Sequence, residues 1–342
     1  MSMKKSFSFG LIALFVLLPV LTGLPEVSAA EKKLLTWGTT ATTSGVFPWY
    51  VFTARILNEK IPDVNITVRG TGGGVHNMRL MEKKEIDIGS CPTANAWDVV
   101  QGKGPFEGTP FADVRLLYVS MTNGLQMVVS EKSGVKTLYD LEGKKFVPGP
   151  PGGGIEQYVR DIFKILGIRP DMPRMGMADQ IDAMKDGRVI GIAKMGVPDA
   201  SILDISSVVK INILSFSEED REKVVQKVMG LRKADFPGGI YAGVGPFKSL
   251  ENEWADFARK DFPPDLAYRF VKTLWENRAE IHKMDPRFLG DRLPEVTLGV
   301  KTNYLHAGAV KFCRELGLTV PKAMIPPEMG EKYVGKESWR RG

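Results

Sequence analysis

Short apolar runs alternate with amphipathic stretches along most of the chain. Residues 64–68 alternate apolar and polar positions as a strand does, and residues 75–84 carry apolar side chains at helical spacing. A strand at 86–89 and a helix from Ala94 repeat this order, and residues 114–119 form a further strand. Strands that alternate with helices predict an α/β fold with mostly parallel sheets and crossover helices.

A second set of alternating elements begins at residues 125–129. It continues with strands expected at 145–147, 189–193, 211–214 and 240–244, and with helices at 155–166, 178–186, 199–206, 217–229, 264–284 and 307–316. The order of strand, polar loop and helix thus occurs once in each half, which predicts two similar lobes.

Residues 37–48, WGTTATTSGVFP, form a polar loop between the first strand and the first helix. Thr39, Thr40, Thr42, Thr43 and Ser44 place five hydroxyls in six positions. Unpaired amides and the positive dipole end at a helix start attract an anion. An ordinary strand-to-helix turn with Ser and Thr caps is the alternative.

Two glycine-rich loops, GTGGG at 70–74 and GPPGGG at 149–154, leave backbone amides open to close approach. Ligands of open α/β sheets bind beyond the carboxyl ends of strands. Two facing lobes would therefore place loops 38–47, 70–74 and 91–93 opposite loops 149–154 and 194–198. The result is a cleft whose neutral donors bind an anion without a buried Arg. A plain tight turn is the alternative for 72–74.

Composition narrows the function classes. The 342 residues are 43% hydrophobic and 25% charged, with a net charge of +6, which is typical of a soluble globular protein. No Lys/Arg cluster is interleaved with aromatics, so a nucleic-acid partner is not expected. Cys91 and Cys313 are too few for a disulfide framework and are predicted to be free and buried.

The N-terminal residues have the pattern of an export signal. Lys4 and Lys5 precede an apolar run at 9–21, and small residues follow at 27–30. We therefore expect a cleavable signal peptide at 1–30 and a periplasmic protein, with an uncleaved membrane anchor as the alternative. No later segment is expected to span a membrane.

Catalytic motifs are missing from the sequence. It contains no Gly-x-Ser-x-Gly elbow and no P-loop, and its three histidines lack metal-ligand spacing. We predict no catalytic residue, metal or cofactor.

Five segments resemble the TAXI family of solute-binding proteins, which serve tripartite ATP-independent periplasmic (TRAP) transporters. They are GTTATTSGVFP, VRGTGGGVHNMRLMEKKEIDIG, VPGPPGGGIEQYV, DAMKDGRVIG with the Gly-Val-Pro turn at 196–198, and YLHAGAVKFCRELG. The resemblance runs from about residue 34 to 318. It implies a two-lobed type II periplasmic binding protein, each lobe a mostly parallel sheet flanked by helices, joined by crossover hinge strands. Lobe I is expected at 31–124 plus 243–342 and lobe II at 125–242, with crossovers near 125–129 and 241–244.

The resemblance also implies ligand contacts from four loops and from the third strand's end. The predicted residues are Thr39, Thr40, Thr43, Ser44, Gly45, Thr71, Gly72, Gly73, Gly74, Thr93, Pro151, Gly152, Gly153, Gly154, Lys194, Met195 and Gly196. The sequence departs from the family pattern at Thr40, Ala41, Thr43 and Ser44, where Gly is usual, at Cys91-Pro92 and at Lys194. We hypothesise that the Lys194 ammonium pairs with a second negative charge on the ligand; an exposed lysine at a strand end is the alternative.

The expected function is that of a monomeric extracytoplasmic receptor. It would bind a small organic anion, a carboxylate or amino-acid-like solute, between its lobes and deliver it to a TRAP membrane permease. Two alternatives stay open at this point: a binding protein of an ATP-driven importer or sensor kinase, and a periplasmic enzyme on the same fold. The enzyme would need a nucleophile, for which Cys91 is the one candidate.

Overall fold

The computed structural model describes residues 32–330, apart from 43, 45, 152, 153 and 301. The expected signal peptide at 1–30 therefore lies outside the described residues. Within the described part, none of the helices is both long and apolar enough to cross a bilayer.

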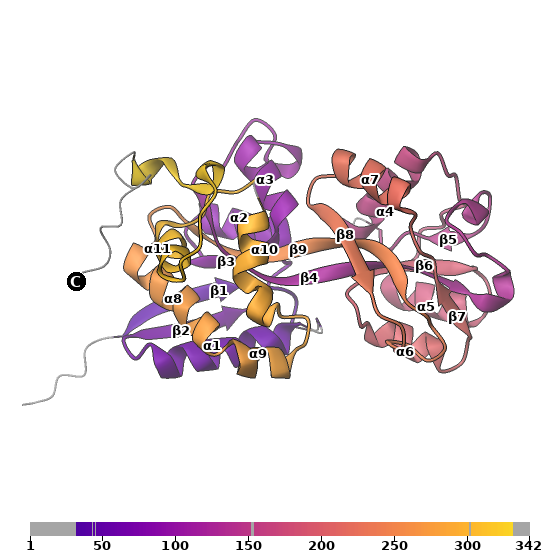
Figure 1. Ribbon diagram of the computed structural model, residues 1–342, viewed down its shortest axis with the longest axis horizontal. Coiled ribbons are helices and arrows are strands. Elements are labelled where there is room, and N and C mark those ends of the chain that lie inside the picture. Colours follow the sequence, from indigo (N-terminus) through magenta and orange to yellow (C-terminus); the bar gives the residue numbers. More distant parts are fainter. Residues whose placement is uncertain (1–31, 43, 45, 152–153, 301, 331–342) are drawn as a thin grey trace, which may run out of the picture. The chain divides into compact units, whose positions relative to one another are not determined.

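The first three strands and their helices confirm the expected alternation. Strands β1 (Lys33–Gly38), β2 (Val64–Arg69) and β3 (Ile88–Pro92) precede helices α1 (Phe47–Lys60), α2 (Gly74–Glu82) and α3 (Thr93–Gln101), respectively (Figure 1). β1 pairs in parallel with both β2 and β3. The carboxyl ends of all three strands therefore lie at one edge of the sheet, where the polar loops begin.

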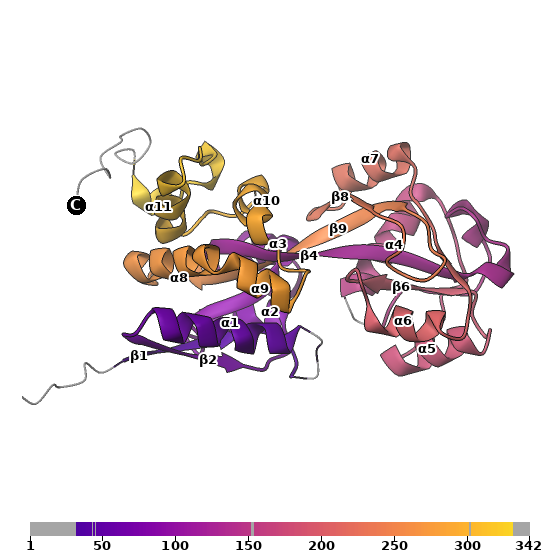
Figure 2. The same cartoon turned by 60° about the horizontal axis from the view of Figure 1, so that its bottom comes forward.

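Two long strands connect this part to the rest of the chain. They are β4 (Val114–Ser130) and β9 (Phe247–Arg259), which pair antiparallel from Val114 opposite Arg259 to Gly124 opposite Glu251 and pass side by side between the two groups of elements in Figures 1 and 2. Met121 and Ala255 belong to one hydrophobic cluster, whereas Leu125 and Leu250 belong to another. We call the first cluster and the elements that contribute to it the first lobe. The elements within residues 125–250 are called the second lobe. The exact lobe boundaries given above stay a prediction.

The predicted strand and crossover at residues 240–244 are wrong. These residues form a turn between β8 (Leu231–Phe236) and β9, and Gly239 and Gly243 adopt positive φ angles that favour glycine. Tyr241 is buried in this turn, and its hydroxyl accepts a hydrogen bond from the Asp199 amide at 2.8 Å. The apolar side chains in this stretch are therefore buried in a turn. A short apolar run in the sequence does not distinguish such a turn from a strand.

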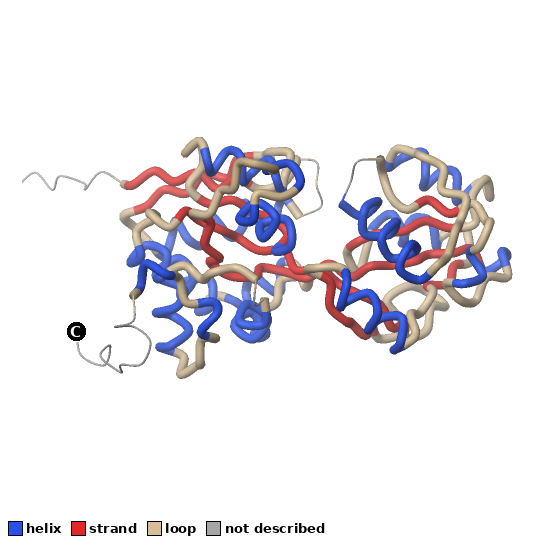
Figure 3. Tube along the Cα trace, turned by 90° about the horizontal axis from the view of Figure 1, so that it is seen from above, coloured by secondary structure: helices blue, strands red, loops and turns tan. Residues whose placement is uncertain are grey.

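The second lobe contains shorter strands around β4. Its further elements are α4 (Gly154–Leu166), α5 (Met177–Lys185), α6 (Ala200–Ser206), α7 (Glu218–Lys227), β5 (Phe146–Val147), β6 (Gly191–Met195) and β7 (Ile211–Ile213). β5 and β6 are parallel, whereas β4 is antiparallel to β6 and β7. The sheet order is β2-β1-β3-β9-β4-β6-β5, with β7 beside β4 and β8 beside β9. Helices cover both sides of the strands in each lobe (Figure 3), and the expected α/β architecture of sheets flanked by helices is confirmed.

The C-terminal helices return to the first lobe. They are α8 (Pro264–Glu276), α9 (Arg278–Met284), α10 (Leu293–Gly299) and α11 (Ala307–Glu315). The single helix predicted at 264–284 is interrupted at Asn277, whose side chain donates to the Thr273 carbonyl at 2.7 Å and so caps α8. Short 3₁₀ helices lie at Gly104–Phe106, Glu131–Ser133, Tyr139–Leu141, Gly290–Arg292, Lys322–Met324 and Pro327–Met329.

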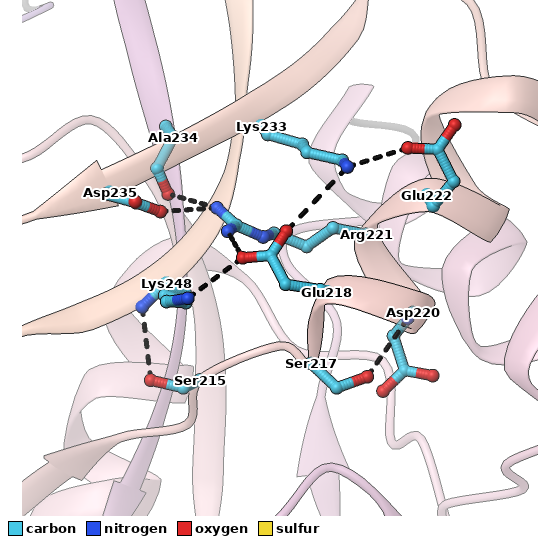
Figure 4. A network of polar contacts seen from close by, with 10 residues as sticks. All are labelled: Ser215, Ser217, Glu218, Asp220, Arg221, Glu222, Lys233, Ala234, Asp235 and Lys248. Carbon is cyan, nitrogen blue, oxygen red and sulfur yellow. Dashed lines mark hydrogen bonds and ion pairs between the residues drawn. The ribbon is translucent and has the colours of Figure 1, made fainter.

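A polar network attaches α7 to β8 and β9 (Figure 4). Ser217 caps α7, as predicted, by accepting from the Asp220 amide at 3.0 Å. One turn later, the buried Arg221 guanidinium pairs with Glu218 and donates to Asp235 at 2.5 Å. Glu218 also accepts from Lys248 on β9 at 2.9 Å. The helix is therefore held against the strand that crosses between the lobes.

Candidate ligand-binding site

A pocket of about 1110 Å³, here called the interlobe pocket, takes its lining from both lobes. Its lining residues are Thr40, Ala41, Ser44, Val46, Trp49, Met121, Asn123, Met177, Lys194, Met195, Pro198, Asp199, Ala200, Ser201, Leu203, Trp254, Met284, Asp285, Pro286 and Arg287. A second pocket, of about 620 Å³ beside α3, α4 and the end of α7, contains none of the predicted site residues. We therefore take the interlobe pocket as the candidate site.

The two crossover strands supply one wall of the pocket. Met121 on β4 lies opposite Trp254 on β9 in the antiparallel register, so both side chains point to the same face of the sheet. The Trp254 indole N–H donates to the Tyr50 hydroxyl at 2.7 Å, which fixes the ring against α1. Trp254 is only partly buried, and the pocket borders its remaining surface. Asn123, two residues after Met121, adds a polar side chain to the same wall.

A buried hydrogen-bond cluster holds the start of the first loop behind this wall. The Trp37 indole N–H donates to Asp256 at 2.8 Å, and the Ser90 hydroxyl also donates to that carboxylate. Burial raises the pKa of Asp256 to about 6, while the hydrogen bonds from Ser90 and Trp37 act in the opposite direction. β1, β3 and β9 are thereby connected at the point where the loop at 39–46 leaves the sheet.

Lys194 on β6 is a buried cation of the second lobe. Only 7% of its surface is exposed, and its ammonium lies 3.1 Å from the Met177 sulfur and 3.7 Å from an Asp199 carboxylate oxygen. The second distance is too long for a hydrogen bond. The other oxygen of Asp199 caps α6 by accepting from the Ser201 and Ile202 amides at 3.0 and 3.1 Å. The alternative of an exposed lysine at the end of a strand is therefore wrong.

A second ion pair borders the pocket from the first lobe. The Arg287 guanidinium donates to both oxygens of Asp285, at 2.9 Å from Nε and 2.6 Å from a terminal nitrogen. The Arg287 amide donates to the same carboxylate at 3.0 Å. Lys194 and this arginine add two cations to the pocket lining, each beside a carboxylate, Asp199 and Asp285, whereas the loops alone predict a cleft of neutral donors. Lys194 and Arg287 lie far apart in the sequence, and the fold brings both to one pocket.

The predicted site residues divide into groups in the structure. Thr40, Ser44, Lys194 and Met195 line the interlobe pocket. Thr43, Gly45, Gly152 and Gly153 lie outside the described residues, whereas Pro151 is exposed and Gly154 begins α4. Gly196 follows Met195 with a φ of 98°, and its carbonyl accepts from the buried Gln126 side chain. A ligand role for any of these residues stays a prediction.

Several predicted hydroxyl and amide donors make internal hydrogen bonds instead. The Gly73 amide donates to the Thr71 hydroxyl at 3.0 Å, and the Gly72 amide donates to His76 at 3.0 Å. The Thr39 hydroxyl donates to the Arg69 carbonyl, and the buried Thr93 hydroxyl donates to Glu253 at 3.1 Å. These bonds stabilise the loops at the edge of the sheet.

Sequence reasoning missed Met121, Trp254 and Arg287. Residues 248–253 mix charged and apolar positions without regular alternation, so the sequence pattern predicts neither β9 nor the position of Trp254 in the fold. The pairing of β4 with β9, which joins residues more than 120 positions apart, brings Met121 and Trp254 to the pocket.

Neither cysteine has the properties of a nucleophile. Cys91 and Cys313 are free and buried, as predicted. Burial raises the pKa of the Cys91 thiol well above its usual range and that of Cys313 to about 12, so the thiolate is disfavoured at neutral pH. Among the described residues, no three His, Cys, Asp or Glu side chains gather as a metal site would require.

Comparisons with known proteins identify a family. The NMT1-like family matches residues 38–317 of the chain. Similar solved structures include the periplasmic aliphatic sulphonate binding protein SsuA of Escherichia coli, at 14% identity and a TM-score of 0.45, covering 87% of this chain and 80% of that one. The probable amino-acid transporter binding protein ytmK of Bacillus subtilis matches at 12% identity and a TM-score of 0.47, covering 76% and 99%. A structure described under glutathione import by Streptococcus mutans matches at 15% identity and a TM-score of 0.48, covering 77% of this chain and 98% of that one. At these values the matches transfer no ligand or partner to this chain.

Proposed function

The chain belongs to the NMT1-like family, and from that premise we propose that it is an extracytoplasmic solute receptor. It binds a small organic anion in the interlobe pocket and delivers it to a membrane permease. The two-lobed fold with two crossover strands supports this function, because such lobes close on a ligand and present the closed form to a partner. Thr40 and Ser44 of the first polar loop line the same pocket as the partly exposed Trp254.

The observation that carries the proposal is the environment of Lys194. An ammonium group has three donors, and burying it without oxygen acceptors is unfavourable. Its neighbours are a sulfur at 3.1 Å and a carboxylate oxygen at 3.7 Å. A carboxylate or sulfonate in the interlobe pocket would supply the missing short hydrogen bonds. The charge of Asp199 already balances the lysine, so the ligand completes hydrogen bonding more than charge.

The delivery partner is a finer part of the proposal. We infer a TRAP permease from the five motifs that resemble the TAXI family, which occur in matching order over residues 34–318. An ATP-driven importer is the competing partner. Transport of a ligand by proteoliposomes that contain the neighbouring permease distinguishes them: uptake driven by an ion gradient without ATP supports a TRAP partner, and strict ATP dependence overturns it. Mass spectrometry of the mature N-terminus tests export, with cleavage near residue 30 expected.

The binding function is tested with Lys194 variants. A thermal-shift screen of organic anions, with mass spectrometry of co-purifying molecules, first identifies a ligand; saturation at 100 times its Kd adds about 2.7 kcal/mol of stability. Lys194→Met is expected to weaken binding by at least about thirtyfold, since losing one partner of a buried charged contact costs about 2 kcal/mol or more. Lys194→Arg retains part of the affinity.

Lys185→Met serves as the matched control, because Lys185 belongs to the same lobe but pairs with Asp204 at 2.7 Å away from the pocket. Its affinity should equal that of the unaltered protein. Equal affinity of the Lys194→Met protein, measured by calorimetry at low and high salt, would show that this ammonium does not contact the ligand.

A further inference from the structure

The walls of the interlobe pocket are largely apolar. Four of the fifteen methionines of the chain line it, namely Met121, Met177, Met195 and Met284, together with Trp254 and Leu203. Methionine side chains are flexible and polarizable, and they adapt to apolar ligands of irregular shape. Met177, Met284 and Leu203 also expose 47%, 39% and 48% of their surface, respectively. This surface would be buried by an apolar ligand.

The charged side chains of the pocket leave one cation for a ligand. Lys194, Asp199, Asp285 and Arg287 are the charged residues among its described lining. Both oxygens of Asp285 are chelated by Arg287, so this pair is nearly neutral as seen from the pocket. Asp199 uses one oxygen to cap α6. The Lys194 ammonium, with its long distance to Asp199, remains as the group that needs an anionic oxygen.

We propose that the ligand is an organic monoanion with a large apolar body, on the order of six or more carbon atoms. The inference rests on the function proposed above and specifies its substrate class. The carboxylate or sulfonate accepts hydrogen bonds from Lys194, and the hydrocarbon part lies against Trp254 and the methionines. A small dicarboxylate or glutamate fits less well, because its second carboxylate would have to compete with Asp285 for Arg287 or be buried against thioethers.

The experiment measures Kd by calorimetry for straight-chain carboxylates from acetate to octanoate and for phenylacetate, with succinate and L-glutamate as comparators. We expect affinity to rise by up to about fourfold per added methylene group, the effect of burying one CH₂. Octanoate or phenylacetate should then bind at least about a hundredfold more tightly than succinate.

Tighter binding of succinate or L-glutamate than of octanoate overturns this inference while leaving the proposed receptor function in place. Absence of binding by every organic anion tested overturns both. Met284→Gln replaces an apolar wall residue by a polar one of similar size. It should flatten the dependence of affinity on chain length, because it removes apolar surface from the wall.

Met229→Gln is the matched control, because Met229 is similarly exposed, at 45%, but lines the smaller pocket beside α3 and α4. The chain-length dependence of this variant should equal that of the unaltered protein. Equal slopes for Met284→Gln and Met229→Gln would overturn the assignment of the apolar wall.

Discussion

The buried Asp256 carboxylate should make the stability of the first lobe fall as pH rises. Asp256 is fully buried, and its pKa is raised from 3.8 to about 6, mainly by burial. A folded-state pKa above the unfolded value contributes stability that is complete below pH 3.8 and is lost as pH rises through about 6. The difference of 6 − 3.8, or 2.2 units, corresponds to about 3 kcal/mol at 1.36 kcal/mol per unit.

His306 should produce the opposite dependence. It is buried at the N-terminus of α11, where its Nδ1 accepts from the Gly308 amide at 3.2 Å, and burial lowers its pKa from 6.5 to about 4. The unfolded chain therefore binds the proton first as pH falls, and stability is lost between pH 6.5 and 4. The difference of 6.5 − 4, or 2.5 units, again corresponds to about 3 kcal/mol. These two contributions nearly cancel between pH 4 and 6.

Asp256→Asn and His306→Asn separate the two effects. The amide introduced in the first variant keeps an oxygen that accepts from Trp37, and the amide introduced in the second keeps a cap for α11. Urea unfolding from about pH 4 to 7.5 should show that Asp256→Asn gains up to about 3 kcal/mol on the unaltered protein as pH rises, and that His306→Asn gains a similar amount as pH falls. All other titrating groups are common to the three proteins, so they do not contribute to the differences in unfolding free energy between a variant and the unaltered protein. Profiles that stay parallel across this pH range would refute the reasoning for the variant concerned.

Two further predictions concern packing and surface charge. Gly308→Ala should lower the free energy of unfolding by about 1–3 kcal/mol, since a Cβ there would lie 2.3 Å from the Pro264 carbonyl oxygen; Gly299→Ala, with nothing within 4 Å, is the control and should be neutral or slightly stabilising in the same urea titration. Hydrogen bonds from Lys248 and Arg221 lower the pKa of Glu218 from 4.5 to about 2, so its contribution is present above pH 4.5 and lost as pH falls toward 2. Glu218→Gln should therefore lower stability at neutral pH and flatten acid unfolding below pH 4.5, whereas an unchanged acid profile would show that the network in Figure 4 is energetically silent.

Local patterns were sufficient for most of the secondary structure. The cap at Ser217, the strand of alternating positions that became β2, and the glycine-preceded start of α4 each depend on neighbouring residues only. The family resemblance also predicted the two-lobed fold. The failures occurred where local signals conflict: a turn at 240–244 rich in apolar residues, and β9, where charged side chains at Glu251 and Glu253 are buried by pairing with Arg232.

The candidate site also combines features that local patterns predict with features that depend on tertiary contacts. Local sequence patterns are sufficient to predict which segments become loops beyond strand ends, because glycine, proline and hydroxyl side chains have local conformational preferences. Local patterns do not show which donors in those loops remain available: the Thr71 and Thr93 hydroxyls donate to residues that only folding brings close, whereas the Gly73 amide donates to Thr71 in the same loop. The burial of Lys194 and the common face of Trp254 and Met121 follow from long-range strand pairing instead. The reason is that burial and pairing depend on the register of β4 with β9 and β6, which joins residues far apart in the chain.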